Sequence, residues 1–163
     1  MLTVERVSRA ATPSSTRLIA QNRKARHDYH IEDVFEAGLV LVGTEVKSCR
    51  EGRVNLTDAY AVIRDGEAWL LGCHISPYSH GNRANHDPTR PRKLLLRHAE
   101  IERLHQAVAQ EGRTLVPLRL YFKHGLAKAE IAVARGKRSY DKRASIAARD
   151  AERRMRQQTG RRR

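Results

Sequence analysis

Alternation of apolar and polar residues recurs through the middle of the chain and predicts strands. Residues 28–43 are rich in Val, Ile, Leu and Phe, and Gly38 stands where such a strand would bulge or bend. Residues 59–71 form two strand-like runs around Asp65-Gly66, which favours a type I′ hairpin turn because both residues tolerate positive φ. Two more strand-like runs flank His124-Gly125: residues 114–123 and 126–136.

Helical periodicity is confined to shorter stretches. Within residues 94–112, Ile101, Leu104 and Val108 fall on one helical face, and Gly112 supplies a stop signal. Three features are expected outside the strands: one or two helical turns at 44–52, an amphipathic helix within 94–112, and a long Gly-, Pro-, Asn- and His-rich loop at 73–93.

At least five strands, with no alternation of strands and long helices, predict a mainly β fold. We expect an OB-type small β-barrel with peripheral α-helices across residues 18–134. Barrels of this type with a basic surface bind single strands or RNA loops through one face and its loops.

Charge is concentrated at one end of the chain. The 163 residues carry a formal net charge of +14, and residues 135–163 contribute 12 basic against three acidic side chains. Such a segment favours a polyanionic partner, although a merely solvating, disordered end has the same composition. Residues 1–17, broken at Pro13, predict a flexible lead-in without the apolar core of a signal peptide. We therefore expect a cytoplasmic protein.

Catalytic and metal-binding signatures are weak. No nucleophile elbow and no phosphate-cradling glycine loop frame the Ser, His and Asp residues, so the sequence predicts neither an enzyme nor a cofactor. The spacing of Cys73, His74, His80 and His86 does not fit a zinc site. Cys49 and Cys73 stand far apart and are expected as core thiols.

Two local features point to RNA. Residues 22–31 (NRKARHDYHI) combine hydrogen-bond donors with Tyr29, which suits phosphate contacts and base stacking, although a solvated edge explains them equally well. Glu36 lies inside the basic body and would repel phosphates unless it accepts from a base or orients a basic side chain. The alternative for Glu36 is a plain charge at a strand edge.

An ordered set of motifs across residues 18–156 resembles the SsrA-binding protein (small protein B, SmpB) family. The matching pieces are NRKARHDY, EAGLVLVGTEVKSCREG, NLTDAY, DGEAWLL, HISPY, NHDPTRPRKLLL, LVPLRLYFK and GKRSYDKR. The resemblance implies a non-enzymatic factor of trans-translation that holds the tRNA-like domain of transfer-messenger RNA. The implied partners are that RNA, the ribosome with its small-subunit decoding centre and mRNA channel, and, indirectly through the shared RNA, elongation factor Tu and alanyl-tRNA synthetase.

The resemblance also implies roles for individual residues. Nine are placed on the RNA-facing surface: Asn22, Lys24, His27, Glu36, Lys47, Arg50, Lys93, Leu95 and Lys123. Five match the signalling motif of the tail, namely Gly136, Lys137, Asp141, Lys142 and Arg143, and Tyr140 is placed in the same motif as a departure from it. Tyr140 stands where many members carry His, and Arg97 stands where some carry Asn.

The tail is expected to be disordered when free and helical on the ribosome, where it probes the vacant mRNA channel. Asp150–Arg154 and Glu152–Arg156 have the favourable i,i+4 order, but charge repulsion makes the helix marginal alone. Arg153, Arg154 and Arg156 are expected to engage phosphates there. Two rival hypotheses are a generic OB-type single-strand binder or ribosome-associated protein, and a metal-assisted nuclease using the His-rich loop.

Overall fold

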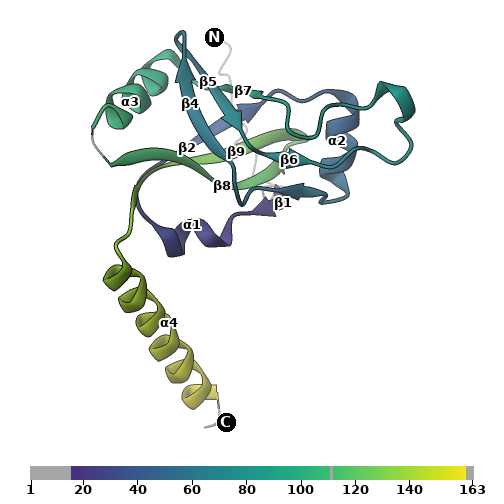
Figure 1. Ribbon diagram of the computed structural model, residues 1–163. Coiled ribbons are helices and arrows are strands. Elements are labelled where there is room, and N and C mark those ends of the chain that lie inside the picture. The colour runs from purple at the N-terminus through teal and green to yellow at the C-terminus, as the bar shows by residue number, and fades with distance from the viewer. Residues whose placement is uncertain (1–15, 111, 161–163) are drawn as a thin grey trace, which may run out of the picture.

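The computed structural model describes residues 16–110 and 112–160, and nine strands and four α-helices lie within these ranges (Figure 1). The strands are β1 (Thr16–Gln21), β2 (Tyr29–Leu39), β3 (Val54–Asn55), β4 (Tyr60–Arg64), β5 (Glu67–Leu71), β6 (His74–Ile75), β7 (Arg92–Leu95), β8 (Arg113–Lys123) and β9 (Leu126–Gly136). The helices are α1 (Arg23–Asp28), α2 (Gly43–Arg50), α3 (His98–Val108) and α4 (Ser139–Gly160), with a 3-10 turn, η1, at Asn82–Ala84.

The antiparallel strands close into a ring. β8 pairs with β9, β9 with β2, β2 with β7, β7 with β5 and β5 with β4. Pairing of Ala61 on β4 with Leu115 on β8 completes the circuit, and β1 adds to the other end of β8. The expected mainly β, OB-type barrel with peripheral helices is therefore confirmed.

The predicted turn at Asp65-Gly66 and the turn at His124-Gly125 both have the positive φ angles that type I′ requires. Asp65 and Gly66 have φ of 52° and 73°, and His124 and Gly125 have φ of 51° and 77°. Gly38 has a different role from the expected bulge, because the irregularity of β2 lies between Ile31 and Asp33. A Cβ atom at Gly38 would lie 3.1 Å from the Leu95 side chain, so glycine allows β7 to approach.

One main core fills the barrel, with Leu70, Ile75, Leu120 and Ile131 fully buried. Cys49 and Cys73 are free thiols in this core, as expected. Burial raises the pKa of Cys49 to about 12 and that of Cys73 to about 11, so both remain protonated and inert near neutral pH. Helix α3 covers the core with Leu104 buried and ends at Val108, four residues before the expected stop at Gly112.

A buried charged cluster joins helix α2 to the long loop. The carboxylate of Glu45, which has no exposed surface, accepts hydrogen bonds from Arg90, from the fully buried Arg92 and from the Val42 N–H. Arg92 also donates to the backbone oxygens of Cys73 and Pro88, at 2.6 and 3.1 Å. The cluster therefore fixes both ends of the loop that leads from β6 to β7.

The predicted segment boundaries shift at both ends of the barrel. Strand β1 begins at Thr16, inside the expected lead-in, while the rest of that lead-in (1–15) lies outside the described residues. Strand β9 continues to Gly136, which pairs with Tyr29, so the barrel extends into the segment assigned to the tail. No helix in residues 16–110 and 112–160 is long and apolar enough to cross a membrane.

The tail forms a helix that projects away from the barrel (Figure 1). Helix α4 is present in the chain alone, whereas the sequence predicts order on the ribosome only; disorder of the free tail in solution stays a prediction. Of the two predicted intrahelical ion pairs, Glu152–Arg156 forms, and Asp150 and Arg154 make none among the described residues.

Candidate nucleic-acid interface

Glu36 holds two donors on the outer surface of the barrel. Its carboxylate accepts a hydrogen bond from the Tyr121 hydroxyl, and the Lys123 Nζ lies 3.3 Å from Oε1. The hydrogen bond from Tyr121, with Lys123 adding to it, keeps the pKa of Glu36 below its ordinary value. Glu36 is therefore charged near neutral pH and orients a basic side chain, which was one of the two interpretations left open.

A second ion pair adjoins the first across the same strands. Arg119 on β8 pairs with Glu130 on β9, and Glu130 lies opposite Glu36 in the β2–β9 register. The Arg119 guanidinium lies 4.8 Å from the centre of the Tyr121 ring. Burial and the Glu36 carboxylate raise the pKa of Tyr121 well above its ordinary range, so its hydroxyl remains a donor.

An exposed leucine borders these charges. Leu95 is 53% exposed and lies against Gly38, which pairs with both Leu95 and Lys128. A groove of about 590 Å³ beside it is lined by Glu36, Leu95, Arg97 and Lys128, among others. We refer to the following residues as the barrel face: Glu36, Leu95, Arg119, Tyr121, Lys123 and Lys128.

The other predicted contacts of the barrel occupy separate places. Lys93 stands two residues before Leu95 on β7 and pairs with Glu67 at 2.9 Å. Lys47, on α2, lies 5.2 Å from the centre of the Tyr78 ring. Arg50 ends α2, where its backbone oxygen accepts from Arg17. The structure thus brings Glu36, Leu95 and Lys123 together and leaves Lys47 and Arg50 on α2.

Asn22 is used by the fold. It is buried, its Nδ2 donates to the backbone oxygens of Pro117 and Leu56 at 3.1 and 3.4 Å, and its Oδ1 accepts from the Ala25 N–H at 3.2 Å. These contacts occupy both polar ends of the amide and cap helix α1. Asn22 therefore positions α1, and an RNA contact by Asn22 stays a prediction.

Lys24 and His27 lie around the carboxylate of Asp28, which no sequence motif marks as a site residue. The Asp28 carboxylate lies 2.8 Å from His27 Nδ1, 4.0 Å from Lys24 Nζ and 3.5 Å from Lys142 Nζ. The hydrogen bond with His27 is the largest cause of the lowered pKa of Asp28. Predicted residues of the body and of the tail thus meet at one carboxylate.

Lys137 strengthens this junction between α1 and α4. Its N–H donates to the Asp28 backbone oxygen at 2.8 Å, and its Nζ donates to the Arg26 backbone oxygen at 3.0 Å and to the Ser145 hydroxyl at 2.8 Å. Helix α4 is therefore docked on α1 through its first turns.

Replacing Asp28 with asparagine is expected to loosen this docking. The ion pair with Lys142, the one that joins Asp28 to α4, is lost; it contributes about 0.2–1 kcal/mol at a partly exposed site, so the equilibrium constant for docking of α4 should fall by up to about fivefold. A fluorescent label on Met155→Cys reports the change, since the native thiols are buried and protonated. Asp150→Asn, in α4 with no ion pair in the described chain, is the control. Equal label anisotropy in both variants contradicts the prediction.

The remaining tail residues are exposed or lie outside the description. Gly136 closes β9, and the side chains of Tyr140 and Asp141 are outside what the structure describes, although both lie within α4. The exposed side chains of α4 include Arg143, Arg153, Arg154 and Arg156.

The His-rich loop is organised by hydrogen bonds. His86 bonds to the Thr44 hydroxyl and to the Ile75 backbone oxygen, both at 2.9 Å, and His80 packs edge-on against Tyr78. Within the part of the chain that the structure describes, no group of three or more His, Cys, Asp or Glu side chains is placed to hold a metal ion.

Comparison with known proteins places this arrangement in a family. The family model "SmpB protein" matches residues 19–161. The chain belongs to the SmpB family. An SsrA-binding protein from Symbiobacterium thermophilum is 64% identical over 84% of this chain and 87% of its own, and one from Acidothermus cellulolyticus is 57% identical over 93% and 96%. A solved structure described as "tmRNA-SmpB: a journey to the center of the bacterial ribosome" is 50% identical, covers 74% of this chain and 85% of its own, and has a TM-score of 0.64.

The SmpB resemblance seen in the sequence is thus confirmed. It did not reveal Tyr121, Arg119 or Asp28, which make the key contacts of the site. Strand alternation contains part of the missing signal, because Arg119, Tyr121 and Lys123 alternate along β8 and therefore share one side.

Proposed function

We propose that this member of the SmpB family binds the tRNA-like domain of transfer-messenger RNA through the barrel face. The observation that carries the proposal is the oriented set of Glu36, Tyr121 and Lys123 beside exposed Leu95, on the surface of a chain with a charge of +14. The cationic side chain of Lys123 can bind a phosphate. The Tyr121 hydroxyl and the Glu36 carboxylate can hydrogen-bond base edges, and Leu95 can pack against an exposed base face. The names of the curated relatives support the same partner.

The proposal extends to the ribosome. The protein delivers the RNA to the A site of a stalled ribosome, and helix α4 enters the empty mRNA channel, with its basic side chains against small-subunit RNA. This step supports tagging of incomplete peptides and release of the ribosome. Elongation factor Tu and alanyl-tRNA synthetase act on the shared RNA and are indirect partners. The role is that of a binding factor and needs no catalytic group or cofactor from the chain.

Replacing Glu36 with alanine tests the barrel face. Loss of the carboxylate frees Tyr121 and Lys123, and we expect affinity for the tRNA-like domain to fall by roughly 1–3 kcal/mol despite the removal of a negative charge. Gel shift at fixed salt measures the change.

Glu102→Ala is the matched control, because it removes the same charge from α3, where the one ion pair of Glu102 among the described residues is with His98 at 3.8 Å. This control should bind as well as the native protein or slightly more tightly. If Glu36→Ala behaves like Glu102→Ala in a folded protein, the assignment of the RNA to the barrel face is wrong.

A further inference from the structure

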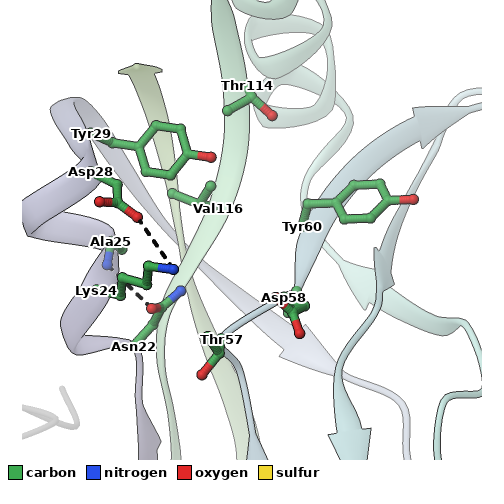
Figure 2. Close-up of a pocket in the computed structure, with 11 residues that line it drawn as sticks. Asn22, Lys24, Ala25, Asp28, Tyr29, Thr57, Asp58, Tyr60, Thr114 and Val116 are labelled. Atoms are coloured by element: carbon green, nitrogen blue, oxygen red, sulfur yellow. Dashed lines mark hydrogen bonds and ion pairs between the residues drawn. The ribbon is translucent and has the colours of Figure 1, made fainter. Parts of the chain in front are cut away.

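A polar cavity of about 510 Å³ lies between helix α1 and the segment that precedes β4 (Figure 2). It occupies the place where strand β8 changes partners. Residues 119–123 of β8 pair with β1, whereas Leu115 pairs with β4. Asn22 bridges this division through its bonds to Pro117 and Leu56, so the floor of the cavity is held by buried hydrogen bonds.

The motifs NRKARHDY and NLTDAY converge on this cavity from opposite sides. Figure 2 shows Lys24, Asp28 and Tyr29 on the side of α1, and Thr57 and Asp58 across from them. The wall between them comes from β8, with Thr114 and Val116. Motifs that are distant in sequence thus build one site, separate from the barrel face.

The polar groups of the cavity are available for a ligand. Among the described residues, the Asp58 carboxylate and the hydroxyls of Tyr29 and Thr57 have no hydrogen-bond partner. At the side of α1, the Lys24 side chain is 66% exposed, and its one ion pair within the described ranges is the long contact with Asp28. Lys142 approaches the same carboxylate from α4. Acceptors therefore line the cavity, and cations stand beside it.

This distribution distinguishes between possible ligands. A cationic side chain would meet Lys24, Lys142 and the strongly basic charge of the whole chain, so it is disfavoured. A nucleotide fits both the acceptors and the cations. Its base has N–H groups that can donate to a carboxylate, and its negatively charged phosphate can pair with lysine side chains. Tyr29, which packs against the buried cluster that contains Ala25 and Val116, offers a supported aromatic ring for an unpaired base.

We infer that the cavity between α1 and residues 57–60 binds an unpaired guanine of an RNA. Guanine is the base that presents two adjacent N–H donors on one edge, and these match the two oxygens of the Asp58 carboxylate. The inference rests on the proposed RNA-binding function and adds a base-selective site away from the barrel face.

The test uses the full-length protein and short oligouridines that carry one central guanosine, inosine or adenosine. Fluorescence anisotropy at fixed salt should show binding of the guanosine oligomer about tenfold tighter than that of the adenosine oligomer, with inosine between them. Asp58→Asn should reduce this preference to about twofold or less, because the amide places a donor against guanine. Asp58→Ser should do the same, because its single, shorter oxygen cannot accept from both N–H groups of guanine.

Asp65→Asn is the matched control, with the same change of charge at an exposed turn whose positive φ asparagine accepts. It should keep the preference. Equal binding of the three oligomers by the native protein overturns the inference, and so does a guanosine preference that survives in Asp58→Asn and Asp58→Ser.

The source of the guanine is identified by repeating the comparison with the tRNA-like domain and with small ribosomal subunits. A loss of affinity in Asp58→Asn relative to Asp65→Asn on one of these names the RNA that supplies the base, and no loss on either overturns the inference. Failure of the native protein to bind the tRNA-like domain would refute the proposed function, while the guanosine preference of the oligomers would still decide this site.

Discussion

Replacing Glu45 with alanine is expected to lower the free energy of unfolding by roughly 3–5 kcal/mol, because it leaves the buried Arg92 without its counter-charge. The substitution also removes the acceptor for the Val42 N–H at the start of α2. Urea unfolding followed by Trp69 fluorescence measures the loss. Glu67→Ala, which breaks the exposed pair with Lys93, should cost about 1 kcal/mol or less. A loss for Glu45→Ala no larger than that for Glu67→Ala contradicts the role of the cluster.

The same carboxylate predicts a pH dependence. Burial by itself would raise the pKa of Glu45, but hydrogen bonds from Arg90, Val42 and Arg92 bring it below the ordinary value of 4.5. Folding therefore favours the charged form, and the contribution is present above that ordinary value and lost as the pH falls through the lower, folded value. The stability difference between the native protein and Glu45→Ala should accordingly shrink in acid.

The strands could be predicted because their signals are local. Alternation marked β2, β8 and β9, and the turns at Asp65-Gly66 and His124-Gly125 need residues that accept positive φ. Helix α1 carries no such signal. It is short and mostly basic, buries only Ala25, and depends on the Asn22 cap and on packing against β8.

The site was predictable only where its residues also carry a local signal in the sequence. Glu36 stood out as an acid in a basic body, and its contact with Lys123 agrees with one predicted role. Asn22 suits a base contact and a helix cap equally well, so composition alone did not predict the cap. The burial of Glu45 with Arg92 depends on residues far apart in the chain, and no local pattern marks a charged side chain as buried.

The tail gives the second large effect. Replacing Tyr140, Asp141, Lys142 and Arg143 together with alanine should leave affinity for the tRNA-like domain within about twofold, since the barrel face is untouched. Tagging of peptides on ribosomes stalled on truncated message should fall by about tenfold or more, because charge-assisted contacts to ribosomal RNA contribute about 1.5–3 kcal/mol each. RNA affinity by gel shift and tagging are measured on the same protein.

Two control variants separate the role of the motif at 140–143 from the docking of α4 on α1 and from the positive charge of the tail. The quadruple change also breaks the contact of Lys142 with Asp28, and Asp28→Asn breaks that contact while leaving the motif intact. If tagging requires the motif itself, Asp28→Asn should retain most of it. Replacing Arg153, Arg154 and Arg156 should instead weaken ribosome engagement in a salt-dependent way, as release of counterions requires. If RNA affinity and tagging fall in parallel in the quadruple variant, the tail is additional RNA-binding surface. If Asp28→Asn loses as much tagging as the quadruple variant, the effect of the quadruple variant comes from undocking of α4.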